Sequence, residues 1–210
     1  MKNLKTLRPG FGNRELNVKD LNNDPITFFN KWLNEAIDAE VTQPNAMTLS
    51  TYSKINGVSS RVVLLKELNE SNFIFYTNYS SPKSCDISED NRVSLNFYWE
   101  KFFRQVKVTG LAFKVSAAKS EEYFKSRPFE SQCAAKASMQ SKELDSRESL
   151  IKVYESLMKE STIEKPDDWG GYQIQATSIE FWQGRDNRLH DRISCTFLEN
   201  GEWNILRKYP

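Results

Sequence analysis

The stretch that decides the fold is MTLSTYSKINGVSSRVVLLKEL, residues 47–68. Apolar, β-branched and aromatic side chains recur on both sides of a polar centre, which predicts two strands over residues 47–53 and 58–68. Between them, Asn56-Gly57 is a dipeptide that favours a tight hairpin turn. The segment therefore predicts an antiparallel β-hairpin.

Further strands are predicted on the C-terminal side of this hairpin, and helices lie between and before them. The predicted strands cover residues 73–78, 92–99, 103–115, 172–183, 192–199 and 202–207, the last two joined by Asn200-Gly201. The first predicted helix begins at Asp24-Pro25. Three others cover residues 83–88, 117–126 and 131–137, and the last begins at a capping box formed by Asp145 and Glu148.

This order of elements predicts one α+β domain with an antiparallel β-barrel or sandwich at its centre. We expect the domain to cover residues 23–210. Residues 1–22 are polar and contain Pro9, Gly10 and Gly12. They are expected to form an N-terminal arm that is ordered where it docks.

Composition narrows the classes of function. The 29 basic and 28 acidic residues nearly cancel, so no overall field would attract nucleic acid or an anionic membrane. The single histidine, His190, excludes multi-histidine metal sites, and three cysteines without C-x-x-C spacing disfavour zinc ribbons and disulfide scaffolds. We expect no metal site. Apolar runs of at most four residues predict no bilayer span, and the expected compartment is the cytoplasm.

Two cations enclose an apolar run in the second strand of the hairpin. Arg61 and Lys66 flank Val-Val-Leu-Leu. In a strand they point to opposite faces. A buried cation is unfavourable unless an anion pairs with it. Two phosphates would serve as partners; the alternative is that both side chains extend to solvent at the strand ends.

Two other segments offer donors for an anion. Residues 76–83 place hydroxyl groups and Lys83 where a strand passes into a short helix, which suits a phosphate or an ordinary polar turn. Tyr123 and Arg127 are four residues apart in a predicted helix, and Ser131 follows the break at Pro128. These three could bind phosphate oxygens or form a solvent-facing helix end.

The densest motif is FWQGRDNRLHDR, residues 181–192. It contains the only histidine together with three arginines and a tryptophan. A lone histidine is commonly structural. Cationic groups crowded in this way repel one another unless they serve an anion or an aromatic system.

Together these segments resemble the pyridoxamine 5′-phosphate oxidase family, also called the pyridoxine 5′-phosphate oxidase family. The resemblance begins near Leu16 and is carried by RVVLLK, FYTN, RQVKVTG, YFKSRP, WGGY and EFWQGRxxRLHDR. It implies a split β-barrel of the FMN-binding type with peripheral helices. It also implies a homodimer with FMN at its interface, built with a C-terminal dimerisation segment.

The resemblance implies a reaction of vitamin B6 metabolism. Pyridoxine 5′-phosphate or pyridoxamine 5′-phosphate would be oxidised to pyridoxal 5′-phosphate by hydride transfer from the substrate C4′ carbon to flavin N5. Oxygen would accept the electrons as hydrogen peroxide, and the amine would also release ammonia. The alternatives are a non-catalytic protein of this fold that carries pyridoxal 5′-phosphate or FMN, and a related flavoprotein with another electron acceptor.

The resemblance also implies roles for individual residues. FMN contacts would fall on Arg61, Val62, Val63, Leu64, Leu65, Lys66, Tyr76, Thr77, Lys83, Gln105, Gln140, Ser141, Trp182 and Arg192. The substrate phosphate would meet Lys66, Tyr123, Arg127 and Ser131, and the catalytic pair Arg188 and His190 would lie against the pyridine ring. The chain departs from the pattern at Pro82, where an arginine is usual, at Phe11, where a tyrosine is usual, and over Cys133–Lys136.

Overall fold

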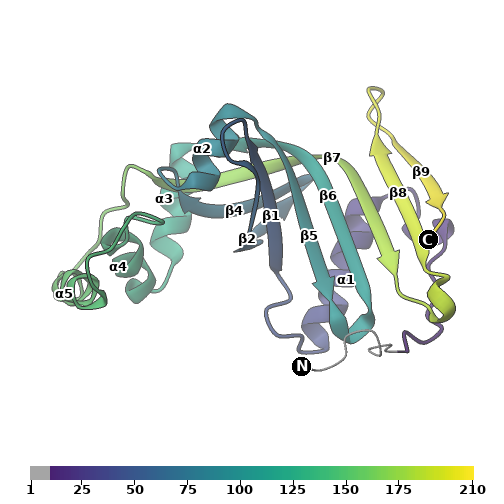
Figure 1. Cartoon of the computed structure of the whole chain (residues 1–210), viewed down its shortest axis with the longest axis horizontal. Helices are drawn as coiled ribbons and strands as arrows, with labels where there is room; N and C mark the ends of the chain where they lie inside the picture. The colour runs from purple at the N-terminus through teal and green to yellow at the C-terminus, as the bar shows by residue number, and fades with distance from the viewer. Residues whose placement is uncertain (1–9) are drawn as a thin grey trace. The chain divides into compact units, whose positions relative to one another are not determined.

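The computed structural model describes residues 10–210 as a sheet with helices packed on it (Figure 1). The strands are β1 (Ala46–Ser53), β2 (Gly57–Leu64), β3 (Glu67–Asn69), β4 (Asn72–Asn78), β5 (Arg92–Trp99), β6 (Arg104–Lys114), β7 (Trp169–Gln183), β8 (Asp191–Phe197) and β9 (Trp203–Lys208). The helices are α1 (Pro25–Asp38), α2 (Pro82–Glu89), α3 (Ala117–Ser126), α4 (Phe129–Ala137) and α5 (Arg147–Leu157), with short 3₁₀ turns η2 (Val18–Leu21), η3 (Glu100–Phe102) and η4 (Asp186–Arg188).

The long strand β7 is where the sheet divides. The strand order is β2-β1-β5-β6-β7-β4-β3, while β8 also pairs with β7 and then with β9. Residues 169–175 of β7 pair antiparallel with β4, and residues 178–183 pair antiparallel with β8. Over residues 10–210 the order does not return to its starting strand, so the sheet is not closed.

The chain forms two compact units. Unit 1 comprises Met1–Leu49, of which residues 10–49 are described, with Ser94–Gly110 and Ala176–Pro210; unit 2 comprises Ser50–Val93 and Leu111–Gln175. Strands β1, β5, β6 and β7 contribute residues to both units.

Aromatic packing holds helix α1 in unit 1. The helix begins as predicted, with the Asp24 carboxylate accepting hydrogen bonds from the backbone of Ile26 and Thr27 and with Pro25 in the first turn. Its buried Phe28 lies edge-on to Phe181 of β7, with ring centroids 5.1 Å apart. Edge-to-face pairs of this kind stabilise a core beyond the area they bury.

The described part of the predicted arm docks on unit 1. Leu16 and Leu21 are each 1% exposed. The backbone N–H of Leu16 donates to the Asp191 carboxylate, and the Arg207 guanidinium donates to the Leu16 carbonyl at 2.8 Å. Residues 1–9 of the predicted arm lie outside the described residues.

Unit 2 contains the remaining helices. Figure 1 shows α4 and α5 side by side at the end of this unit. Tyr154 and Leu157 of α5 pack on a buried cluster that includes Phe124 of α3, Cys133 of α4 and Trp169 of β7. In residues 10–210 no helix combines the length and the apolar composition needed to cross a membrane.

The structure corrects three local predictions. The strand predicted over residues 58–68 is broken, because β2 ends at Leu64 and β3 begins at Glu67. The predicted capping box of Asp145 and Glu148 is wrong by one residue: Ser146 is the N-cap, and its side chain accepts from the backbone of Ser149. The last hairpin is joined by five residues, 198–202, and not by Asn200-Gly201 alone, because β8 ends at Phe197 and β9 begins at Trp203.

Candidate functional site

A cavity of about 910 Å³ lies within unit 2. This volume is typical of a pocket for a small molecule or cofactor. Strands β2 and β4, helices α2, α3 and α4 and the first residue of β7 contribute to its wall. The lining residues are Ser59, Arg61, Val62, Val63, Leu64, Lys66, Tyr76, Thr77, Asn78, Pro82, Lys83, Tyr123, Arg127, Pro128, Ser131, Ala134, Ala135, Ser138, Gln140, Ser141 and Trp169.

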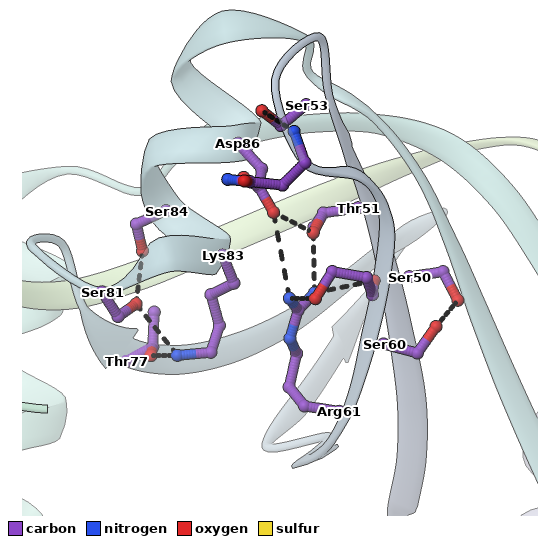
Figure 2. A network of polar contacts seen from close by, with 12 residues as sticks. Ser50, Thr51, Ser53, Ser60, Arg61, Thr77, Ser81, Lys83, Ser84 and Asp86 are labelled. Atoms are coloured by element: carbon purple, nitrogen blue, oxygen red, sulfur yellow. Dashed lines mark hydrogen bonds and ion pairs between the residues drawn. The ribbon is translucent and has the colours of Figure 1, made fainter. Parts of the chain in front are cut away.

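Arg61 is oriented by a polar network behind it (Figure 2). Its Nη1 donates to Thr51 Oγ1 at 2.7 Å, and its Nη2 donates to Ser59 Oγ at 2.7 Å. The buried carboxylate of Asp86 on α2 accepts from Thr51 at 2.6 Å and lies 3.8 Å from Arg61. Burial lowers the pKa of Arg61, and Asp86 opposes that shift. The cation within the apolar strand is therefore balanced by a carboxylate of the chain itself.

Lys83 differs from Arg61 because its hydrogen-bond acceptors are neutral. The side chain is buried, and its Nζ donates to Thr77 Oγ1 at 3.1 Å, Ser81 Oγ at 2.9 Å and Gln140 Oε1 at 2.9 Å. Within residues 10–210 it has no carboxylate at ion-pair distance. Burial, reinforced by the nearby Arg61, lowers the pKa of Lys83 to about 8. An ammonium group held in this way is a strong site for an anion.

Three parallel aromatic rings form another part of the wall. Tyr76 stacks on Tyr123 with centroids 3.8 Å apart and planes 15° apart. Trp169 lies 5.5 Å from Tyr76 and 6.2 Å from Tyr123, again nearly parallel to both. Burial raises the pKa of Tyr76 to about 12 and raises that of Tyr123. Both hydroxyls therefore remain protonated and can donate hydrogen bonds at neutral pH.

Two glycines make room for tyrosine rings, Gly171 for Tyr76 of this stack and Gly170 for Tyr79 outside it. A Cβ at Gly171 would lie 2.8 Å from Cε1 of Tyr76 and 2.9 Å from Cγ2 of Val115, and a Cβ at Gly170 would overlap the Tyr79 hydroxyl. Real contacts are not this short, so the Tyr76 ring can hold its position only because residue 171 has no side chain.

We expect Gly171→Ala to destabilise the ligand-free protein by roughly 1–3 kcal/mol, because the added methyl overpacks the site and displaces the Tyr76 ring. Thermal or urea unfolding measures the change. Gly10→Ala is the matched control, since its Cβ would meet only Asp186 Oδ1 at 3.8 Å. Equal stability of the Gly171 and Gly10 variants would contradict the crowding argument.

Arg127 has one buried N–H donor without an acceptor within residues 10–210. Its guanidinium carbon lies 5.0 Å from the Trp169 ring centroid, and burial lowers its pKa. Its Nη1 is buried and has no hydrogen-bond partner among the described residues. The predicted sharing of one helix face by Tyr123 and Arg127 is wrong in detail, because α3 ends at Ser126 and Arg127 is its extended C-cap. Both residues nevertheless line the cavity, as does Ser131 in the first turn of α4.

A second group of predicted site residues lies in unit 1. The centroid of the His190 ring lies 4.8 Å from that of Trp182 and 5.1 Å from that of Phe11. Its Nδ1 accepts from the backbone N–H of Arg185 at 3.0 Å, so the other ring nitrogen carries the proton in the neutral form. Burial and the nearby Arg188 lower the pKa of His190, which favours that neutral form at pH 7.

Carboxylates relieve the repulsion expected within the motif 181–192. Arg192 donates to both oxygens of Glu180 at 3.0 Å, and Arg185 pairs with Asp191 at 3.4 Å. Arg188 is exposed, and its φ of 61° places it in the left-handed region. Such a conformation is uncommon for a residue with a side chain and is often found at functional sites.

The cavity gathers most of the residues predicted in unit 2. Thirteen predicted positions line it: Arg61, Val62, Val63, Leu64, Lys66, Tyr76, Thr77, Lys83, Tyr123, Arg127, Ser131, Gln140 and Ser141. Leu65 is buried and is not among the lining residues. The other predicted positions belong to unit 1: Gln105, Trp182, Arg188, His190 and Arg192.

The sequence predicts Arg61 and Lys66 on opposite faces of one strand. Both line the same cavity. The prediction assumed an unbroken strand, but β2 ends at Leu64, so the strict alternation of faces ends before Lys66.

The departures from the family pattern are accommodated locally. Phe11 packs edge-on against Phe103, with centroids 5.1 Å apart. Pro82 begins α2 and lines the cavity, so the wall has an apolar ring at that position. Cys133 is fully buried beside Phe124.

Sequence reasoning missed some of the lining residues. They are Ser59, Pro128, Ala134, Ala135, Ser138 and Trp169. The signal for Trp169 was present in the sequence, because a tryptophan directly before Gly170-Gly171 marks an aromatic ring beside closely approaching backbone.

Known proteins resemble this chain along its whole length. The family model "Pyridoxamine 5'-phosphate oxidase" matches residues 33–156, and "Pyridoxine 5'-phosphate oxidase C-terminal dimerisation region" matches residues 169–210. A pyridoxine/pyridoxamine 5′-phosphate oxidase of Bacteroides thetaiotaomicron is 43% identical, with 100% of both chains covered. One of Teredinibacter turnerae is 47% identical, covering 99% of this chain and 100% of the relative.

Solved structures share the fold. PhzG from Burkholderia lata, in complex with tetrahydrophenazine-1-carboxylic acid, has a TM-score of 0.90 at 27% identity and covers 96% of this chain and 100% of its own. A pyridoxamine 5′-phosphate oxidase-related, FMN-binding protein of Nostoc punctiforme has a TM-score of 0.73 at 12% identity, covering 89% and 98%. The matching family models and the full-length identities show that this chain belongs to the pyridoxamine 5′-phosphate oxidase family, whose α+β split β-barrel fold it shares.

Proposed function

We propose that this chain oxidises pyridoxine 5′-phosphate and pyridoxamine 5′-phosphate to pyridoxal 5′-phosphate, with FMN as cofactor and oxygen as electron acceptor. Family membership makes it an oxidoreductase of this type. The observation that carries the proposal is the cavity itself, whose four lining cations, Arg61, Lys66, Lys83 and Arg127, we divide into two sets. Arg61 and Lys83 form one set, on β2 and α2, while Arg127 forms the other, after α3.

The first set fits the phosphate of FMN. Lys83 is a buried cation whose acceptors Thr77, Ser81 and Gln140 are all neutral, so a phosphate would supply its missing counter-charge. Arg61 is already oriented by Thr51 and Ser59. When bound here, FMN would supply the redox chemistry, as acceptor of a hydride from the substrate and donor of electrons to oxygen, while Arg61 and Lys83 would hold its phosphate.

The second set fits the phosphate of the substrate. Arg127 has a buried Nη1 without a partner in the described chain. Tyr123 brings a protonated hydroxyl, and Ser131 and Lys66 also line the cavity. Charge-assisted hydrogen bonds from such donors fix the position of a phosphorylated ring. The main contribution of the protein to a hydride transfer is to hold the two reacting groups in alignment.

His190 and Arg188 are proposed to contact the pyridine ring of the substrate. A neutral His190 whose Nδ1 accepts from Arg185 can donate its Nε2–H to a substrate oxygen. We further propose a homodimer with FMN at its interface, because residues 169–210 match a C-terminal dimerisation region.

The test combines a spectrum with an assay. The purified protein, supplied with FMN, is expected to retain a flavin absorbance band and to produce pyridoxal 5′-phosphate and hydrogen peroxide when pyridoxine 5′-phosphate is added in air. Bound flavin without peroxide would favour the non-catalytic carrier. Turnover only with an electron acceptor other than oxygen would favour the related flavoprotein.

A further inference from the structure

Arg127 and Arg61 lie in the same cavity but are held in different ways. Arg61 is bonded to hydroxyls and lies 3.8 Å from the Asp86 carboxylate. Arg127 has no carboxylate at ion-pair distance within residues 10–210, and its guanidinium carbon lies 5.0 Å from the Trp169 ring and 5.8 Å from the Phe124 ring. Aromatic faces, rather than an anion, therefore hold Arg127.

This form of support leaves the charge of Arg127 available. An aromatic face attracts a guanidinium without neutralising it. The buried Nη1 also keeps its hydrogen-bonding capacity, because none of the described residues accepts from it. A ligand phosphate that entered the cavity would meet a full positive charge and an unused donor on the same group.

Trp169 is itself held firmly enough to orient a neighbour. It is 7% exposed, lies 5.2 Å from Phe124 in an edge-on pair, and is nearly parallel to Tyr76. Its backbone is also fixed, since residue 169 pairs with Asn78 in the sheet and its N–H donates to the Pro166 carbonyl at 3.0 Å. The indole therefore offers a rigid plane at the start of β7.

We propose that Trp169 is a positioning residue for the substrate phosphate: its indole orients Arg127 toward that phosphate and so makes the enzyme select phosphorylated over unphosphorylated substrates. The inference rests on the proposed function, in which Arg127 binds the substrate phosphate. Trp169 acts through Arg127, and the selectivity it gives is separate from the hydride transfer.

The test compares two variants of the FMN-loaded enzyme on two substrates, pyridoxine 5′-phosphate and pyridoxine. Trp169→Met keeps an apolar side chain of useful size but removes the aromatic face. It is expected to lower the ratio of kcat/KM for the phosphorylated over the unphosphorylated substrate by about 10-fold, through KM. Trp169→Phe keeps a smaller aromatic face and should lose only about 2–3-fold. The inhibition constant for inorganic phosphate should rise in both variants, and more in Trp169→Met than in Trp169→Phe.

Leu157→Ala is the matched control. Leu157 packs on the same buried cluster as Trp169 but does not line the cavity, so its loss should lower Tm and leave the substrate ratio unchanged. An equal loss of activity on both substrates in Trp169→Met, or a ratio that stays at the wild-type value in both variants, would overturn the inference. If Trp169→Met does not fold, Trp169→Phe decides alone: an unchanged ratio and an unchanged phosphate inhibition constant refute it. A wild-type enzyme without preference for the phosphorylated substrate would instead refute the proposed function.

Discussion

Replacing Lys83 with methionine is expected to raise the dissociation constant for FMN by about 10–100-fold, because one charge-assisted contact to the phosphate is lost. Riboflavin, which lacks the phosphate, should bind the variant as it binds the wild type, within about 2-fold. Quenching of flavin fluorescence on the cofactor-free protein measures both constants. Lys101→Met is the control, because Lys101 is exposed and donates to the Ala39 carbonyl outside the cavity.

The pH dependence of FMN binding gives a second, independent signature. In the free protein the pKa of Lys83 is lowered to about 8, whereas a bound phosphate dianion would raise it. Binding therefore takes up a proton above pH 8, so the affinity of the wild type for FMN should fall as pH rises through 8 and beyond. The Lys83→Met variant should lack this slope. A wild-type affinity that is flat from pH 7 to about 9.5 would contradict the assignment of Lys83 to the phosphate.

The stability of the FMN-free protein should change in the opposite direction. Burial lowers the pKa of Lys83 below its unfolded value, so between about pH 8 and 10.5 the unfolded chain binds more protons than the folded one. The wild type should therefore gain stability relative to Lys83→Met as pH rises through that interval, and thermal unfolding at pH 7 and pH 10 measures the difference. As pH rises through this range, the titration of Lys83 should thus weaken FMN binding and stabilise the FMN-free protein.

Much of the fold could be predicted because local chemistry sets the boundaries of many elements. The predicted strand 92–99 and the predicted helix 117–126 have the observed bounds of β5 and α3. The helix is bounded by Ser116, whose side chain accepts from the Lys119 backbone, and by Pro128 shortly after its end. Residues near in sequence decide both ends, so the sequence pattern is sufficient there.

Other features depend on partners distant in sequence. The break after Leu64 could not be predicted from an apolar run, because it depends on a contact distant along the chain, in which the Lys66 N–H donates to the Ile74 carbonyl of β4. The balance of Arg61 by Asp86 joins residues from β2 and α2, and Asp86 gave no functional signal in the sequence. Resemblance supplied most residues of the cavity wall. The contacts of Arg61 with Thr51 and of Arg127 with Trp169 involve two residues outside the predicted set, and only the folded structure reveals them.

Replacing Arg127 with methionine is the second large effect we expect. The change removes the charge and the buried Nη1 donor together, so kcat/KM for pyridoxine 5′-phosphate should fall by roughly 100-fold. The activity on unphosphorylated pyridoxine should change by no more than about 3-fold, because that substrate makes no phosphate contact. Lys125→Met is the control two residues away, in the last turn of α3, since Lys125 is exposed and its ammonium pairs with Glu121 at 3.1 Å.

The same substitution should not weaken the ligand-free fold. The variant loses the contact of the guanidinium with Trp169, worth about 0.5–2 kcal/mol. It also removes a buried donor that has no acceptor in the described chain, and an unsatisfied donor of that kind costs about 1–3 kcal/mol. These two effects nearly cancel, so the Tm of the ligand-free variant should equal or exceed that of the wild type. A large fall in Tm would mean that Arg127 holds the fold together, and the loss of activity could then no longer be assigned to the phosphate.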